Sequence, residues 1–231
     1  MLAILHPANS DSQLRSLIRS ISDGSFSDNA RAPVAVIVEA EPEKRAPEPL
    51  RLVQQFLNSV ELDEDDEELG TPEALHDWLA ARDLIAPGTR LTAADLRRAI
   101  DVREGLRALL YVHNGGDPDP KAVERLERAA AGAPLRAGFG PDGPPRLVPA
   151  GGGAPAGLAG LLAIVSAAAV DGTWSRLKAC ADEGCRWAFY DRSKNRSGRW
   201  CSMEVCGNQQ KARAYRERRR TGTDPERKAR S

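Results

Sequence analysis

The sequence has 231 residues, of which 41% are hydrophobic and 5% aromatic, and this suits one domain with a small attached module or two small domains. Its net charge of zero conceals an asymmetry, because residues 180–231 hold 14 Lys/Arg against 7 Asp/Glu, which leaves +7 there and −7 on residues 1–179. No apolar run is long enough for a membrane span, and residues 1–13 lack the pattern of a secretory signal. We therefore expect a cytoplasmic protein that does not enter a membrane and whose basic end meets a polyanion.

The first 172 residues are predicted to form a variable extension and a helical domain. The extension, residues 1–47, contains one strand-like run at 34–38 and then a Pro/Glu/Lys-rich link. In the domain, residues 48–172, apolar spacing and N-cap residues predict helices over 50–60, 72–82, from 93 past 109, 120–131 and 158–170. The Gly/Pro-rich residues 132–157 are expected to be a loop with a short strand at 146–148, and 173–178 a further short helix.

An acidic run, ELDEDDEE at residues 61–68, has seven acids in eight positions. A solvated loop is the interpretation that we favour. Calcium binding is disfavoured because the run lacks the glycine and the alternating ligands of an EF-hand loop. A third interpretation is an internal ligand that shields the basic end of the chain until nucleic acid displaces it.

Several polar side chains of the helical domain resemble parts of a ligand site. Lone His residues carry no motif, so we expect His76 and His113 at helix surfaces or ends and Trp78 in the core. Arg97, Arg103 and Arg107 are similarly expected on a solvated helix face and not in an anion site.

All four cysteines of the chain lie close together, with the spacing C-x4-C-x15-C-x4-C over Cys180, Cys185, Cys201 and Cys206. Two close pairs of thiolates at this separation can supply the tetrahedron that zinc prefers, whereas disulfides are rare in the cytoplasm. Idle thiols and disulfides remain the alternatives. Because four thiolates leave no open coordination position, we expect one structural zinc, required for the folding of this module but not of the helical domain.

The segment around and after the cysteines is basic. Between the pairs, residues 186–190 resemble a strand and 193–198 a turn, with 199–200 leading back as a hairpin. Ser202 is a suitable N-cap for a helix over 203–220. Phosphate contacts are expected from Lys/Arg, and base contacts from amide side chains at the start of the helix. The predicted nucleic-acid-binding residues are Arg192, Lys194, Asn195, Arg196, Arg199, Asn208, Gln209, Lys211, Arg213, Arg216 and Arg220.

The chain carries none of the common catalytic motifs: no HExxH, Walker A sequence, GxSxG or GxGxxG. We therefore expect that it is not an enzyme. Three non-enzymatic functions remain open beside duplex DNA binding. The module could bind RNA or single strands by stacking bases on Trp187, Phe189, Tyr190 or Trp200. It could instead bind proteins, with zinc serving only to stabilise the module. It could also be an accessory to a small-molecule-binding domain.

The segment RWAFYDRSKNRSGRWCSMEVCGN resembles the CGNR-type zinc finger, and residues from PLRLVQQFLNSVE to LTAADLRRAIDVREGLRALL resemble the ABATE domain that precedes it in bacterial proteins. The resemblance covers about residues 48–220. It implies a stress-induced transcription regulator in which the four cysteines bind zinc. One departure is clear, since the family tetrad ends in Arg but this sequence has Gln209.

We therefore predict a mainly α protein with a small α+β, treble-clef-like zinc module at the C-terminus. Its domains would be 1–47, 48–172, 173–220 (the zinc finger) and a flexible tail, 221–231. The module would bind nucleic acid, with duplex DNA as the favoured form. The acidic helical domain would be a sensor or oligomerisation unit, with a small-molecule effector and a homo-oligomer as further expected partners.

Overall fold

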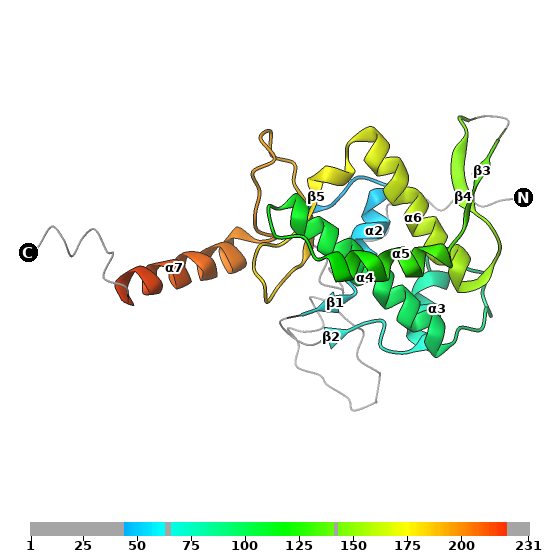
Figure 1. The fold of residues 1–231 in the computed structure, drawn as a ribbon, viewed down its shortest axis with the longest axis horizontal. Coiled ribbons are helices and arrows are strands. Elements are labelled where there is room, and N and C mark those ends of the chain that lie inside the picture. Colours follow the sequence, from blue (N-terminus) through cyan, green and yellow to red (C-terminus); the bar gives the residue numbers. More distant parts are fainter. Residues whose placement is uncertain (1–43, 63–65, 141–142, 221–231) are drawn as a thin grey trace, which may run out of the picture. The chain divides into compact units, whose positions relative to one another are not determined.

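In the computed structural model of the chain, residues 44–62, 66–140 and 143–220 are described. These residues belong to one compact unit, which spans 39–231. Figure 1 shows helices throughout it, with short strands between them. This confirms the predicted mainly α class with a small mixed module at the C-terminal end. The strand expected at 34–38 lies outside the described residues.

Five helices build most of the core, in the order α2 (Leu50–Leu57), α3 (Pro72–Ala80), α4 (Ala93–His113), α5 (Pro120–Ala131) and α6 (Gly153–Asp171). α4 is the longest and packs against the other four. The sequence predicts that Ala99, Val102, Leu106 and Leu109 share its inward face; the first three are buried, whereas Leu109 is half-buried and Leu110 is fully buried. From α3, Leu75, Trp78 and Leu79 are buried in the same core, as expected.

The helix starts follow the predicted N-cap residues. The Thr71 hydroxyl accepts a hydrogen bond from the Ala74 N–H at 3.1 Å, and Asp119 does the same for Ala122 at 3.0 Å. Thr92 and Asp95 form the reciprocal pair of a capping box. Each cap satisfies an N–H group that has no partner within the helix, which fixes where α3, α4 and α5 begin.

The strands form three antiparallel pairs in the described residues: β1 (Val60–Glu61) with β2 (Asp66–Glu67), β3 (Leu135–Gly138) with β4 (Arg146–Pro149), and β5 (Leu177–Ala179) with β6 (Ala188–Tyr190). The strand predicted at 146–148 is confirmed, but its partner β3 was not expected. The short helix predicted over 173–178 is wrong. A single 3-10 turn, η2 (Trp174–Arg176), leads directly into β5, because β6 offers this segment a ladder of hydrogen bonds.

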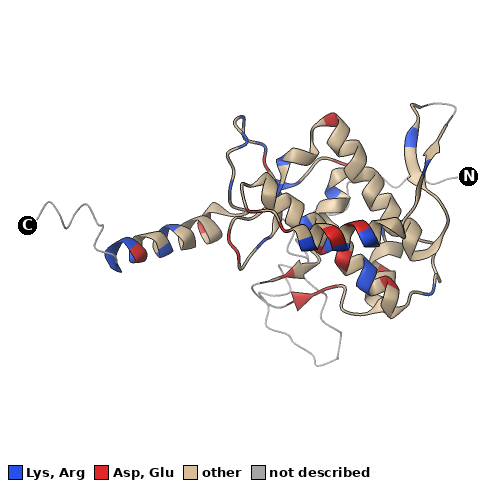
Figure 2. Cartoon of the chain, viewed as in Figure 1, with Lys and Arg blue, Asp and Glu red and all other residues tan. Residues whose placement is uncertain are grey.

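The acidic run is also more ordered than a solvated loop. Its ends pair as β1 and β2, and residues 63–65 between them lie outside the described residues. Figure 2 shows acidic residues on both of these strands. One acid, Glu67, is half-buried against the core and contacts α4, as described below.

Helix α6 contains the longest apolar run of the sequence. By length and composition it could cross a membrane, alone among the described helices, and 33% of its apolar window is buried within the fold. Length and apolar composition are weak evidence for a span, because core helices share both properties. Leu158, Ala159 and Leu161 are fully buried in the common core, whereas Val170 near the end of the helix is 91% exposed.

Two arginines of α4 are buried, which corrects the prediction that they lie on a solvated face. Only Arg97 of the predicted three is exposed. Arg103 is 3% exposed and makes a bidentate pair with Glu67, at 2.6 and 2.7 Å. Burial would raise the pKa of the Glu67 carboxyl, but this pair outweighs burial and lowers it.

Arg107, one turn further along α4, is 4% exposed. Its guanidinium donates to Glu104 at 3.0 Å, to the Leu57 carbonyl and, at 3.0 Å, to the Arg186 carbonyl. Burial lowers the pKa of Arg107, against the opposing effect of Glu104. Leu57 ends α2 and Arg186 lies between the first cysteines and β6, so one side chain joins three distant parts of the chain.

Replacing Arg107 with Met should lower the free energy of unfolding by about 2–4 kcal/mol, because it leaves the Leu57 and Arg186 carbonyls without their donor, while Glu104 keeps its bond from Arg103. Arg97→Met on the exposed face of the same helix is the matched control and should change stability by less than about 0.5 kcal/mol. Urea unfolding of the zinc-loaded chain measures both. Equal changes in the two variants would contradict a structural role for Arg107.

Candidate metal centre and nucleic-acid surface

The first cysteine pair lies in the loop between β5 and β6. All three residues of each strand are buried, and the Cys180 N–H donates to the Trp187 carbonyl at 2.9 Å, which closes the loop above the last strand pair. This hairpin differs from the predicted one: β6 pairs back to β5 and not forward to residues 199–200. Arg199 instead accepts, at its carbonyl, the N–H of Ala181 at 3.0 Å.

Amide side chains of α2 and its C-terminal end hold the free edge of β6. The Asn58 amide group pairs with both backbone groups of Ala188, at 2.7 and 2.9 Å. Gln54, which is buried, donates to the Ala188 carbonyl at 3.0 Å and accepts from the Ala46 N–H at 2.7 Å. These bonds replace a third strand, and they attach the cysteine hairpin to the helical region.

The second pair lies at a helix start. Cys201 precedes the N-cap Ser202, whose hydroxyl accepts from the Val205 N–H at 3.3 Å. Cys206 lies within η3 (Met203–Gly207), a π-helical turn that continues into α7 (Asn208–Arg220). Gly207 is closely packed, because a Cβ would lie 2.3 Å from Met203 Sδ and 3.2 Å from the Trp200 ring, and both side chains would have to shift to admit it. Close packing on the cysteine loop therefore explains this glycine.

The four cysteine sulfurs form one cluster. All four Sγ atoms lie within 4.8 Å of one another, and Cys201 is 3.6 Å from both Cys185 and Cys206. Four thiolates around one zinc at 2.3 Å stand about 3.8 Å apart at tetrahedral geometry. All four cysteines are free, at separations far beyond a disulfide bond. The donor set therefore fits one structural zinc bound by Cys180, Cys185, Cys201 and Cys206.

The thiols influence one another strongly. Hydrogen bonds from Cys185 and Cys201 lower the pKa of the Cys180 thiol, and the same bonds raise the pKa of the two donors. Burial raises the pKa of Cys206. Zinc binds thiolates, so a bound ion would take the place of the protons that the thiols share. Zinc binding would therefore release these protons to solvent.

Asn114, directly after α4, connects the helical region to both cysteine pairs. It is buried, and its amide nitrogen donates to the carbonyls of Ala179 and Arg199, both at 2.8 Å. Ala179 precedes Cys180, and Arg199 lies two residues before Cys201. One side chain thus fixes the spacing between the two backbone segments that supply the metal ligands. His113 beside it contacts the Leu177 carbonyl at 2.9 Å and belongs to this junction, not to a ligand pocket.

A buried ion pair shapes the loop between the cysteine pairs. Lys178 of β5 donates to Asp191 at 2.8 Å and to the carbonyls of Arg196 and Gly198 at 2.6 and 3.1 Å. Burial would raise the pKa of the Asp191 carboxyl, but Lys178 and the N–H groups of Ser193 and Gly198 outweigh it and hold the pKa well below its usual range. The turn predicted at 193–198 is therefore built around this pair.

The predicted nucleic-acid-binding residues occupy two surfaces. The first, which we term the basic loop, is residues 192–199, and its predicted residues are all exposed: Arg192, Lys194, Asn195, Arg196 and Arg199. Several of them are positioned by contacts. Arg192 donates to the Arg45 carbonyl at 2.9 Å, and Arg196 donates to the Ser175 hydroxyl at 3.1 Å.

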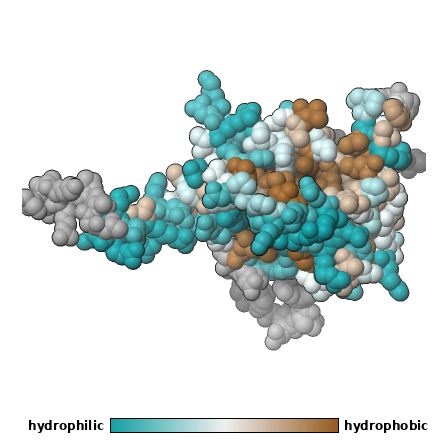
Figure 3. Space-filling model, in the orientation of Figure 1, coloured by the Kyte–Doolittle hydropathy of each residue, from teal (hydrophilic) through white to brown (hydrophobic). Residues whose placement is uncertain are grey.

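The second surface is α7, whose predicted residues are also exposed: Asn208, Gln209, Lys211, Arg213, Arg216 and Arg220. No residue of α7 is buried. In Figure 3 its visible surface is hydrophilic, whereas hydrophobic patches lie over the helical region. Arg213 is 3.5 Å from Asp182 of the first cysteine loop, which orients the helix on the metal centre.

Comparisons with known families agree with this geometry. Residues 176–219 match the CGNR zinc finger, and residues 50–172, more than half of the chain, match ABATE, described as a "putative stress-induced transcription regulator". The chain belongs to the ABATE family. A search of curated proteins gave no match. In this ABATE protein, position 209, where the family tetrad is expected to have Arg, holds an exposed Gln on α7.

Asn114→Ala should weaken zinc binding about tenfold, since it frees the two backbone segments that carry the ligands. Competition against a chromophoric chelator measures the affinity. Asn195→Ala, in the exposed basic loop, should leave the affinity unchanged, and Cys201→Ser should abolish stoichiometric binding. Wild-type zinc affinity in Asn114→Ala would show that the metal centre does not depend on the helical region.

Proposed function

We propose that this ABATE protein is a non-enzymatic, cytoplasmic transcription regulator that binds duplex DNA through its zinc-finger module. The observation that carries the proposal is the character of α7. It has 13 residues with six Lys/Arg and one Glu, and none of them is buried. A helix of this length is marginally stable in water without packing, and like charges three and four residues apart weaken it further. Phosphates that neutralise this charge would stabilise the helix.

The attachment of α7 to the metal centre also supports the proposal. A zinc-pinned module with a basic helix suits insertion of the helix into a groove, with Lys/Arg on the flanking phosphates. We assign phosphate contacts to Lys211, Arg213, Arg216 and Arg220, and to the cations of the basic loop. Asn208 and Gln209 begin the helix and are exposed, so they are the candidates for base contacts, for which adenine is the preferred partner of an amide.

The burial of the aromatic residues favours a duplex over single strands. Base stacking needs exposed rings. Phe189 and Tyr190 are buried, while Trp187 and Trp200 are half-buried. These rings therefore serve mainly as the small core of the module, which weakens the RNA and single-strand alternatives.

For the helical region we propose a regulatory part, through an effector or a homo-oligomer. Its core is continuous with β5 and β6, since Leu177, Ala188 and Tyr190 belong to the same buried cluster as α2 and α4. A change in the packing of the helices would therefore alter the packing of β5 and β6 in the zinc-finger module.

Duplex DNA binding should weaken steeply with salt. If about five of the cations on α7 and the basic loop meet phosphates, log K should fall against log salt with a slope of about −4.5. Arg216→Ala should flatten the slope by about 0.9 and weaken binding equally across sequences. Fluorescence anisotropy with labelled duplexes over a salt series measures both quantities.

The matched control is Arg128→Ala on α5, an exposed arginine paired with Glu124, which should leave the slope unchanged. Gln209→Arg, which creates the family tetrad, should steepen the slope if position 209 faces a phosphate and leave it unchanged if it faces a base. No duplex binding by the zinc-loaded wild type at about 20 mM salt, where screening is weak, would refute the proposal and favour a protein-interaction module.

A further inference from the structure

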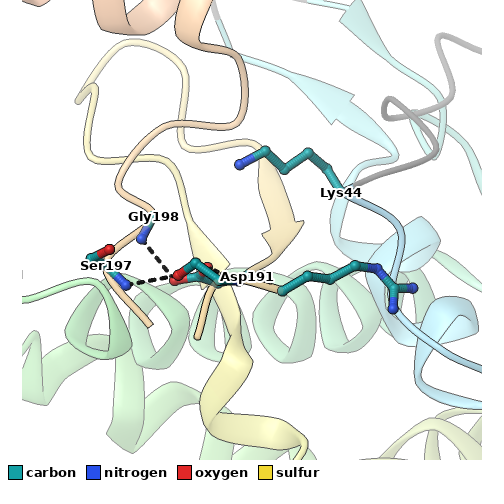
Figure 4. Close-up of a pocket in the computed structure, with 6 residues that line it drawn as sticks. Lys44, Asp191, Ser197 and Gly198 are labelled. Atoms are coloured by element: carbon teal, nitrogen blue, oxygen red, sulfur yellow. Dashed lines mark hydrogen bonds between the residues drawn. The ribbon is translucent and has the colours of Figure 1, made fainter. Parts of the chain in front are cut away.

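A small open pocket lies between the basic loop and the segment that precedes α2. Figure 4 shows Lys44 extending toward the side of the loop that carries Asp191, Ser197 and Gly198. The pocket has a volume of about 450 Å³, within the range of small-ligand sites. Its lining residues are Lys44, Asp191, Arg192, Ser193, Ser197 and Gly198. Lys44 lies outside both matched regions, which are residues 50–172 and 176–219.

The charge of this pocket is positive. The only acid that lines it, Asp191, is 2% exposed at its side chain and is neutralised by the buried Lys178. Its oxygens already accept hydrogen bonds from Lys178 and from the N–H groups of Ser193 and Gly198. The charges of Lys44 and Arg192 are thus left without an acid to balance them in the pocket, and neither forms an ion pair in the described part of the chain.

Both cations are held in position without being neutralised. The Lys44 ammonium lies 5.0 Å from the centre of the Phe189 ring, and the Arg192 guanidinium lies 5.4 Å from the centre of the Tyr190 ring. Arg192 also donates to the Arg45 carbonyl. Aromatic rings and a carbonyl orient a cation but leave its charge available for an anion.

Hydroxyl groups complete the site. The Ser193 hydroxyl accepts the Ser197 N–H at 3.0 Å, so its own proton can be donated to a ligand. Ser197 also lines the pocket. Two cations and two hydroxyls around a small cavity match a phosphate, which carries negative charge and several acceptor oxygens.

We propose that this pocket binds one phosphate group, with Lys44 and Arg192 supplying the charge and Ser193 and Ser197 donating hydrogen bonds. The phosphate belongs either to a DNA backbone or to a free small anion. The first source rests on the proposed DNA-binding function, and the second does not. In both cases Lys44 extends the functional surface beyond the zinc finger.

The test is titration of inorganic phosphate into the zinc-loaded full chain, freed of excess metal, followed by calorimetry. Lys44→Gln should weaken phosphate binding about tenfold, the effect of losing one charge-assisted hydrogen bond. Lys44→Arg should retain most of the affinity. Lys121→Gln on α5 removes the same charge from an exposed position that does not line the pocket, and should stay within about twofold of wild type. Thermal melting of each variant confirms that the fold is intact.

Equal losses in Lys44→Gln and Lys121→Gln, or no phosphate binding by wild type, would overturn the pocket. A labelled duplex then distinguishes the two sources. If the duplex displaces phosphate, the pocket belongs to the DNA-binding surface. If the duplex binds without displacing phosphate, the pocket binds a free anion. If duplex binding depends on Arg216 but phosphate binding does not depend on Lys44, the pocket is refuted and the DNA-binding proposal stands. If phosphate binding depends on Lys44 but no duplex binding is seen, the DNA-binding proposal is refuted and the pocket stands.

Discussion

The Arg107 guanidinium lies where the helical core meets the cysteine-bearing hairpin, and almost none of it reaches solvent. A buried charge is tolerated only when it is paired and its hydrogen bonds are satisfied. Here Glu104 supplies the charge, and carbonyls from the end of α2 and from Arg186 supply the acceptors. Arg186 itself has a φ of 52° and stacks its side chain on Tyr111. The position of the hairpin on the helices follows from this network.

The same junction determines how the metal centre is built. Gln54 and Asn58 hold β6, and Asn114 holds the segments before both cysteine pairs. These side-chain hydrogen bonds mean that the zinc finger is not a structurally independent module. We therefore revise the expectation that the helical domain folds independently of zinc, because strands β5 and β6 contribute to the core that the helices bury.

The polar residues divide into two groups with different uses. Arg103, Arg107, Lys178 and Asp191 are buried and paired, and they determine structure. The cations of α7 and the basic loop are exposed instead, and where acids pair with them, as Asp182 does with Arg213, the arginine stays largely in solvent. This distribution concentrates unneutralised positive charge on the zinc-finger module, where a polyanion can reach it.

Local signals in the sequence predicted much of this protein. Thr71, Thr92 and Asp119 marked the helix starts because a cap acts within three residues, and the cysteine spacing indicated zinc because the ligand number and geometry of the ion are restrictive. The buried arginines could not be predicted in this way. Arg103 meets Glu67 36 residues away and Arg107 meets Arg186 79 residues away, so their burial depends on tertiary structure that spacing does not encode. The β5–β6 pairing was missed for a related reason, since Leu177–Ala179 is too short for a period to be read and the burial of its central Lys178 depends on Asp191, 13 residues away.

The central claim is that the metal centre and the helices form one cooperative unit. Thermal unfolding of the zinc-loaded chain tests it most directly when zinc release, followed with a chromophoric chelator, is recorded together with far-ultraviolet circular dichroism. A shared core predicts that the zinc and the helices of the core are lost in one transition with the same midpoint. Release of zinc several degrees below the loss of helical signal, with the helices intact in between, would contradict it.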